Sequence, residues 1–384
     1  MRRRWLVALV AVVPAAAGLV AYFVTSGSGP RAAEPARAIA VSAGLSDSCA
    51  ILDDHTVRCW GANLAGELGD GSRVDRSTPV SVAGLSNATA IATGFHHTCA
   101  LLADRTVDCW GWNQYGQLGD GTTTDRLRPV PVSGLHDVVA VSAQGESSCA
   151  LLADASVRCW GSNRYGQLGD GTTSDRHTAV TVLSGVTQIS AGTGHACAVL
   201  ADRTVRCWGL NAFGQLGDGS TTSRLRPVQP AGLSDVASVA TGNRDTCAVL
   251  ADHTARCWGA DDSGELGDGR TTGQDKPTAV RGLSGATSIV PGVSRTCALL
   301  TARTVTCWGD TGGSPLSNSN AASPHLTPTP IAGLTGVTAI SGFGEHICAL
   351  SESVHCWGSN DSGQLGDDST TDRTGPVPVG LHAG

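Results

Sequence analysis

Short apolar segments alternate with polar, glycine-containing turns along most of this chain. One unit carries AVSAQ (140–144), SCALLAD (148–154), SVRCWG (156–161) and TAVTVLSG (178–185), with a glycine-rich segment at 162–176. Apolar segments of this length that are bounded by turn residues are typical of β-strands. The unit therefore predicts four strands, of which the second and third form a hairpin.

Strand alternation places apolar side chains on both faces of that hairpin. One face carries Cys149, Leu151, Val157 and Cys159, and the other carries Ala150, Leu152 and Trp160. A sheet that is apolar on both faces must be covered on both, so each unit needs a neighbour on either side.

The unit recurs with a period near 50 residues, and seven copies cover residues 39–384. Seven four-stranded sheets that each cover the next form a β-propeller. The sequence thus predicts an all-β fold, a seven-bladed β-propeller with four-stranded blades. We expect the strand richest in Ala, Ser and Gly to lie innermost, and the first and last strands (38–44 and 375–381) to meet and close the ring.

The cysteines all belong to the repeats and form seven pairs: Cys49 and Cys59, Cys99 and Cys109, Cys149 and Cys159, Cys197 and Cys207, Cys247 and Cys257, Cys297 and Cys307, and Cys348 and Cys356. Folding each segment as a hairpin places its two cysteines opposite one another, at the separation that a disulfide needs. The last pair is two residues shorter, which removes one residue from each arm and preserves the pairing. Because structural zinc sites use closely spaced cysteines in sets of four ligands, the spacing favours seven disulfides over metal or redox chemistry.

The N-terminal segment 1–24 differs from the repeats: three arginines precede an apolar run from Trp5 to Val24. It is either a signal peptide, with a cleavage site near Ala15–Ala17, or an uncleaved membrane anchor through residues 5–24. Both interpretations predict a protein that is secreted or anchored on the outer side of the cytoplasmic membrane. Residues 25–38 are expected to form a flexible linker.

Charge and motifs narrow the function further. The chain carries a net charge of −7, and residues 1–38 contribute +4, so the repeats carry −11. An acidic body is a poor match for nucleic acid. The sequence lacks the common hydrolase, metalloprotease and nucleotide-binding motifs, so we expect no catalytic residue, no cofactor and no metal.

Two polar patterns leave alternatives open. His96, His97, His195 and His346 precede first cysteines, and their convergence at the channel mouth would allow a hydrolase or lyase; exposed polar turns are the favoured interpretation. Asp120 and Asp125, with their repeats in other blades, could bind calcium, but an Asp-Gly pair is also a common tight-turn signal. We favour turns.

The irregular aromatic residues point to a binding surface. Trp112, Tyr115, Tyr165 and Phe213 follow the CWG motif in three consecutive repeats. Because they occupy equivalent positions on consecutive blades, we expect these four residues to form one patch on a single rim. Trp and Tyr are enriched at interface hot spots, so we expect this patch to bind a partner.

The segment CWGWNQYGQLGDGTTTDRLRPVPVSGL (109–135) resembles the regulator of chromosome condensation repeat family. The resemblance implies a seven-bladed propeller. It also implies a guanine-nucleotide-exchange-like regulator as an alternative, because the nuclear members exchange nucleotide on a small GTPase. The sequence as a whole predicts a monomeric, exported module that presents rim loops to a protein or cell-envelope partner.

Overall fold

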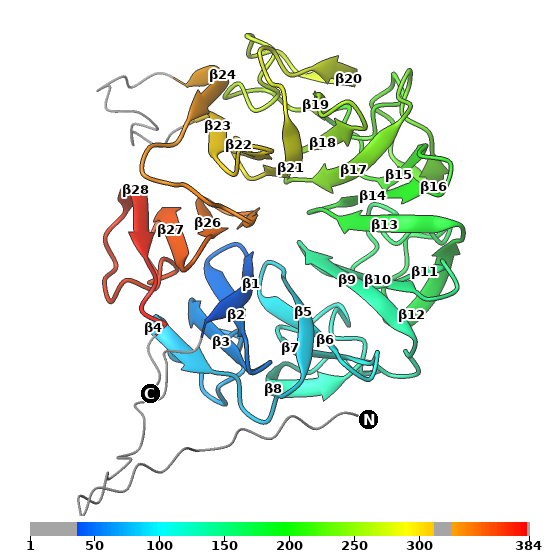
Figure 1. Ribbon diagram of the computed structural model, residues 1–384. Helices are drawn as coiled ribbons and strands as arrows, with labels where there is room; N and C mark the ends of the chain where they lie inside the picture. The colour runs from blue at the N-terminus through cyan, green and yellow to red at the C-terminus, as the bar shows by residue number, and fades with distance from the viewer. Residues whose placement is uncertain (1–36, 311–323, 382–384) are drawn as a thin grey trace, which may run out of the picture. The chain divides into compact units, whose positions relative to one another are not determined.

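The computed structural model describes residues 37–310 and 324–381, which belong to one compact unit. In this part of the chain, 28 strands form seven four-stranded antiparallel sheets, each built from consecutive strands. The sheets surround a common axis (Figure 1). The predicted seven-bladed β-propeller with four-stranded blades is confirmed.

Each blade uses its four strands in the same order. The first strands are β1 Ala38–Ala43, β5 Ala88–Thr93, β9 Val138–Gln144, β13 Val186–Ala191, β17 Val236–Thr241, β21 Ala286–Pro291 and β25 Ala339–Gly342. The second strands are β2 Asp47–Leu52, β6 His97–Leu102, β10 Ser147–Leu152, β14 His195–Leu200, β18 Asp245–Leu250, β22 Arg295–Leu300 and β26 His346–Leu350. The third strands are β3 Val57–Gly61, β7 Val107–Gly111, β11 Val157–Gly161, β15 Val205–Gly209, β19 Ala255–Gly259, β23 Val305–Gly309 and β27 Val354–Gly358. The fourth strands are β4 Arg76–Ser81, β8 Arg126–Pro131, β12 Arg176–Leu183, β16 Arg224–Val228, β20 Gln274–Ala279, β24 His325–Pro330 and β28 Arg373–Pro378.

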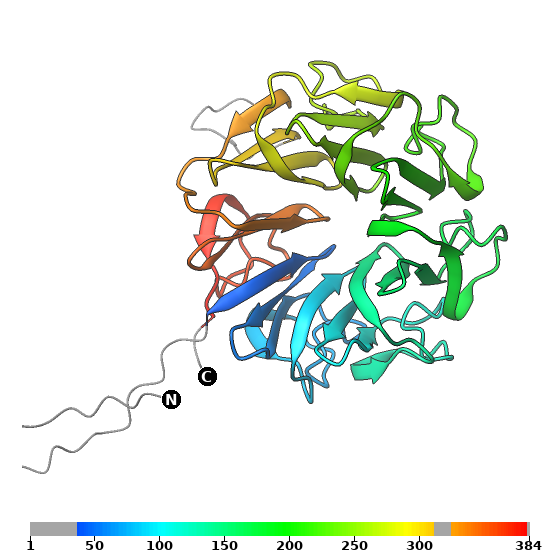
Figure 2. The same ribbon diagram turned by 45° about the vertical axis from the view of Figure 1, so that its right-hand side comes forward.

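The first strands lie innermost and contact one another around the axis (Figures 1 and 2). Their small side chains allow seven strands to approach closely. Neighbouring first strands are also joined by polar contacts, such as the one between the hydroxyls of Ser42 and Thr93 at 2.8 Å. The predicted position of the Ala- and Ser-rich strand is therefore confirmed.

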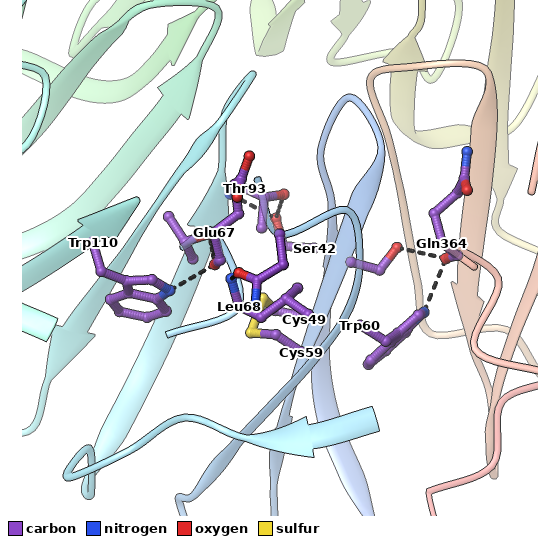
Figure 3. Close-up of a disulfide and its surroundings, with 12 residues drawn as sticks. Ser42, Cys49, Cys59, Trp60, Glu67, Leu68, Thr93, Trp110 and Gln364 are labelled. Atoms are coloured by element: carbon purple, nitrogen blue, oxygen red, sulfur yellow. Dashed lines mark hydrogen bonds between the residues drawn. A yellow bond between two sulfur atoms is a disulfide. The ribbon is translucent and has the colours of Figure 1, made fainter. Parts of the chain in front are cut away.

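Each hairpin is closed by its own disulfide. Cys149 lies directly opposite Cys159 in the β10–β11 ladder, and Cys348 lies opposite Cys356 in the shorter β26–β27 hairpin. Seven such disulfides join the described strands, and the paired Cα atoms are 4.0–4.1 Å apart. Figure 3 shows the disulfide of the first blade. The cysteines are buried between blades, so the sulfur atoms are also part of the apolar core.

The CWG tryptophans join each blade to the one before it. Trp160 is fully buried against Cys99 and Leu101 of the preceding blade. Its Nε1 donates to the carbonyl oxygen of Gln117, 2.9 Å away in the preceding blade's long loop. Figure 3 shows the same bond from Trp110 to Glu67 and from Trp60 to Gln364. The apolar packing thus recurs at successive interfaces, and six of the seven indole N–H groups are satisfied in this way; Trp357 Nε1 has no partner among the described residues.

The ring closes without sharing a strand between blades. β1 and β28 each belong to the sheet of their own repeat, so the first and last strands do not pair as neighbours in one sheet, but residues of both segments lie in one apolar cluster between the first and seventh blades. Each repeat begins at an inner strand and ends at an outer one, which leaves no strand to exchange. Closure instead rests on apolar packing between the first and seventh blades and on the bonds that Trp60 and Ser48 donate to the Gln364 carbonyl.

The predicted signal peptide or anchor (1–24), most of the predicted linker (25–38) and residues 311–323 lie outside the described residues. Across residues 37–310 and 324–381 no helix is long and apolar enough to cross a membrane.

Candidate functional site

The propeller has two chemically different faces. The face that we call the loop face carries the turn between the first and second strands of each blade and the long connection between the third and fourth. The opposite face, the hairpin face, carries the turn between the second and third strands. On the loop face these two segments are bonded together; for example, the Trp112 amide donates to the His96 carbonyl at 2.7 Å.

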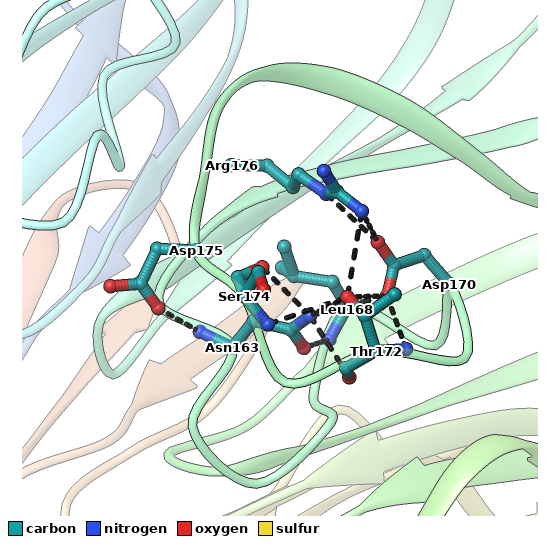
Figure 4. A network of polar contacts seen from close by, with 7 residues as sticks. All are labelled: Asn163, Leu168, Asp170, Thr172, Ser174, Asp175 and Arg176. Atoms are coloured by element: carbon teal, nitrogen blue, oxygen red, sulfur yellow. Dashed lines mark hydrogen bonds and ion pairs between the residues drawn. The ribbon is translucent and has the colours of Figure 1, made fainter.

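The long loops of five blades each contain a buried asparagine that bonds across the loop. In the third blade, the Asn163 side-chain amide donates to Asp170 at 3.2 Å and to the carbonyls of Thr172 and Ser174 (Figure 4). Its Oδ1 accepts from the Leu168 amide at 3.0 Å. One side chain therefore satisfies backbone groups from across the loop, which makes this loop a preformed scaffold.

The Asp-Gly carboxylates serve these loops. Asp170 pairs with Arg176 at 2.7 Å, and Asp175 accepts a hydrogen bond from the backbone N–H of Asn163 at 2.7 Å. Although burial alone would raise it, the pKa of Asp170 lies below its ordinary value because Thr172 and Arg176 donate hydrogen bonds to it. Asp120 and Asp125 have the same bonds in the second blade, in agreement with the turn interpretation.

Aromatic residues are segregated to the loop face. Seven described aromatic residues are the CWG tryptophans of the core. Every other Phe, Tyr and Trp of the described residues lies in a loop-face segment: Phe95, Trp112, Tyr115, Tyr165, Phe213 and Phe343. The hairpin-face turns contain none. The predicted binding residues therefore share one face.

Four rings of the second blade form a continuous series on the loop face, and a fifth ring, from the seventh blade, packs against one end of it. Phe343 of the seventh blade is fully buried against Phe95, with ring centroids 5.4 Å apart. Phe95 is followed by His96 at 6.5 Å, and His96 meets the edge of Trp112 at 6.0 Å. Trp112 and Tyr115 then form an edge-to-face pair at 5.3 Å. We call Phe95, His96, Trp112 and Tyr115 the aromatic series; all four are partly exposed.

A buried carboxylate contacts the His96 ring of the aromatic series. Glu67 of the first blade is 1% exposed, and its Oε1 lies 3.2 Å from His96 Nδ1. Its Oε2 accepts from the Ala65 amide at 2.8 Å, which holds the carboxylate in place. The side chain of His96 is 40% exposed, so its ring spans from this buried anion to the surface.

Tyr165 and Phe213 occupy the same loop position as Tyr115 but have different neighbours. The Arg164 guanidinium lies 4.6 Å from the Tyr165 ring, and that of Arg244 lies 4.9 Å from Phe213. Phe213 is 41% exposed, the most of the six aromatic residues. The structure thus joins Trp112 and Tyr115 directly, whereas Tyr165 and Phe213 each carry a cation–π contact.

Buried histidines hold the blades together. His97 Nε2 lies 2.9 Å from the Ser148 hydroxyl of the next blade, and that hydroxyl donates to the Gln117 carbonyl. The hydroxyl therefore accepts from the histidine, which makes the imidazole the Nε2–H tautomer. His195 and His346 repeat the arrangement at two other interfaces. Burial lowers the pKa of each of these three histidines to about 3.

The proposed channel-mouth histidines therefore do not converge. His96 contacts Glu67, and His195 contacts Thr246 in a different interface. Glu345 lies within 3.5 Å of Arg295, at the junction of the sixth and seventh blades. Over the described residues, no group of three or more His, Cys, Asp and Glu side chains is arranged to hold a metal ion.

Sequence reasoning missed two contributors to this face. Phe95 and Phe343 lie at different offsets from their cysteines, and the contact between them crosses the first blade, so only the closed ring brings them together. The GFHH segment (94–97) is the available signal, because Phe95 and His96 break the usual glycine- and serine-rich turn.

Comparisons with known proteins agree with this architecture. Sequence profiles described as regulator of chromosome condensation (RCC1) repeats match residues 54–101, 107–151, 154–199 and 204–249, with a second profile on 88–117, 138–167 and 186–215. A search of curated protein sequences finds no match.

Solved structures show the same fold. Human WBSCR16 is 24% identical over 84% of this chain and 93% of its own, with a TM-score of 0.75. Yeast RCC1 (Prp20), in a complex with Kap60, is 21% identical over 90% of this chain and 85% of its own, with a TM-score of 0.74. The ectodomain of the Physcomitrella patens receptor kinase CR4 is 21% identical over 84% and 74%, with a TM-score of 0.56. With its repeats matched and its seven blades resolved, this chain belongs to the regulator of chromosome condensation (RCC1) repeat family.

Proposed function

We propose that this protein is an exported binding module that docks a protein partner on its loop face, through Trp112, Tyr115, Tyr165 and Phe213. The observation that carries the proposal is the segregation of aromatic residues. Outside the core tryptophans, all the described ones lie on one face. Large aromatic side chains give the most binding energy per residue at interfaces, and rigid loops limit the entropy lost on binding.

Export is supported by two independent features. The apolar segment 5–24 predicts translocation or anchoring. Seven disulfides favour an oxidising environment outside the cytoplasm. A partner in that setting is an extracellular or cell-envelope protein, and the acidic repeats disfavour nucleic acid.

Relatives support binding as the general role of the fold. One solved structure shows yeast RCC1 (Prp20) with Kap60, and another concerns the binding of Prp20p from Saccharomyces cerevisiae to Gsp1p and histones. Those partners belong to those proteins. No observation on the described residues favours a hydrolase, lyase or nucleotide-exchange site here, since the buried histidines lie in separate interfaces.

Site-specific photo-crosslinking in the native host tests the proposal. A photoreactive residue replaces Gln114, Arg164 or Ala212 on the exposed tips of the long loops, or Ala103, Ala153 or Ala201 on the hairpin face as matched exposed controls. We expect the same partner to be trapped from loop-face positions only. Trapping from the hairpin face instead, or equally from both, would contradict the proposal.

The direct test of the aromatic series is the double variant Trp112→Ala and Tyr115→Ala. Partner capture should fall at least tenfold, because each truncated hot-spot residue costs about 1–2 kcal/mol or more. The thermal midpoint should stay close to wild type, because both side chains are partly exposed. A large drop in the midpoint with unchanged capture would assign these residues to packing alone.

A further inference from the structure

The long loop of the fifth blade differs from its sister loops at several positions, two of which act together. Five other blades place an asparagine in the loop core, namely Asn63, Asn113, Asn163, Asn211 and Asn360. The same five blades pair the following aspartate with an arginine, as in Arg76, Arg126, Arg176, Arg224 and Arg373. The fifth blade has Asp261 and Gln274 at these positions.

Asp261 places an oxygen where the sister loops have an amide nitrogen. It is fully buried, and its Oδ1 accepts from the Leu266 amide at 2.9 Å, as Asn163 Oδ1 does from Leu168. Its Oδ2 therefore occupies the position of the asparagine NH2 group. That NH2 group donates to an aspartate and to backbone carbonyls, whereas Oδ2 of Asp261 is buried without a hydrogen-bond partner among the described residues.

Asp268 has lost its cationic partner in the same loop. Its Oδ1 accepts from the Arg270 amide at 2.9 Å, but its Oδ2 is buried and unpartnered within the described part of the chain. Gln274 does not replace the missing arginine, because its Nε2 donates to the Thr272 carbonyl at 2.9 Å. The loop thus holds two unpartnered carboxylate oxygens where the sister loops hold one carboxylate, one arginine and one amide.

We propose that the fifth-blade loop binds a divalent cation of the calcium type through Asp261 Oδ2 and Asp268 Oδ2. Hard divalent cations take carboxylate and carbonyl oxygens as ligands and fill the remaining positions with water. A cation here supplies the positive charge that the arginine provides elsewhere, and it satisfies two buried oxygens that are costly to leave unpaired. The sequence predicts no metal ion, and the proposal differs from that prediction in the fifth blade alone.

The site lies beside the loop-face surface. Asp262 follows Asp261 in the chain and pairs with Arg244 at 3.1 Å, and Arg244 covers the Phe213 ring. A bound cation therefore orders the loop next to one of the aromatic residues.

Calorimetric titration and thermal unfolding of the whole repeat-containing protein test the proposal, with calcium chloride as the probe and EDTA as the reference. Both are run at pH 8, because burial raises the pKa of Asp261 to about 7 and a proton would otherwise compete. We expect one calcium ion per chain and a thermal midpoint about 3–6 °C higher at a hundredfold excess over Kd.

Two variants keep the test decisive. Asp261→Asn restores the sister-loop amide, so it should fold normally and lose both the binding and the calcium-dependent shift. Asn163→Asp combined with Arg176→Gln copies the fifth-blade residues into the third blade and should raise the stoichiometry to two. Absence of binding, binding that survives Asp261→Asn, or a midpoint that responds to pH near 7 but not to calcium would overturn the proposal.

Discussion

The three buried histidines predict a specific acid sensitivity. His97, His195 and His346 are neutral Nε2–H donors to hydroxyls of the next blade, and burial lowers the pKa of each to about 3. In the unfolded chain a histidine titrates near 6.5. Between these values the unfolded state binds protons that the folded state does not. Their stabilising effect is therefore complete above pH 6.5 and decreases as the pH falls towards 3.

The size of the stability loss follows from the number of pH units below the pKa of histidine in the unfolded chain. Each unit of pH below 6.5 costs about 1.4 kcal/mol for each histidine, so acidification to pH 5 costs about 2 kcal/mol each and about 6 kcal/mol for all three. Two buried carboxyls oppose this trend. Burial raises the pKa of Asp47 and Asp245 well above the ordinary value, so they cost stability as the pH rises above 3.8 and return some of it on acidification. Single histidine variants are needed to separate the two effects.

The assay compares His195→Gln with wild type in urea denaturation at pH 7.5 and pH 5.0, with disulfides intact. Gln keeps a hydrogen-bond donor for Thr246 but does not titrate. The variant should therefore lose about 2 kcal/mol less unfolding free energy on acidification than the wild-type protein does. His136→Gln is the control, because the side chain of His136 is 73% exposed. An equal pH dependence in wild type and His195→Gln would refute the reasoning, as would an NMR titration in which every histidine titrates near pH 6.5.

Two further changes test the interfaces and the hairpins. Trp160→Phe removes the indole N–H bond to Gln117 and part of the ring, so urea denaturation should show a loss of about 2 kcal/mol; no measurable loss would contradict the role of the CWG tryptophans. Replacing Cys149 and Cys159 together by alanine should cost about 2–3 kcal/mol for a ten-residue separation in the chain-entropy treatment, measured by the same assay, and an unchanged stability would show that the clamp is redundant.

Much of the fold follows from local regularities. The spacing of Cys149 and Cys159 is enough to place them opposite one another in a hairpin. Cys348 and Cys356 are two residues closer in sequence, one residue fewer on each arm, and they remain opposite one another. The apolar residues on both hairpin faces require neighbours, and the sevenfold period leaves a propeller as the solution. These inferences succeed because each depends on a single blade and its nearest neighbours.

Other features depend on how blades meet, and a single repeat does not contain that information. The contact between Phe343 and Phe95 spans three blades. The carbonyl that accepts from Trp60 belongs to Gln364, some 300 positions later in the chain. The first and last strands meet through apolar packing and not through pairing in one sheet, because the repeat and the sheet have the same boundaries. His97 and His195 looked like exposed turn residues, whereas they start buried strands.

Seven sheets, each closed by its own disulfide, form one ring, and we propose that this ring lies outside the cytoplasm. The most direct test is peptide mapping, without reduction, of the protein isolated from its native host with free thiols blocked at lysis. We expect seven cross-linked peptides that each join the two cysteines of one repeat, and no blocked thiol. Blocked cysteines in the native protein, or cross-links between different repeats, would contradict both the clamped sheets and the oxidising location.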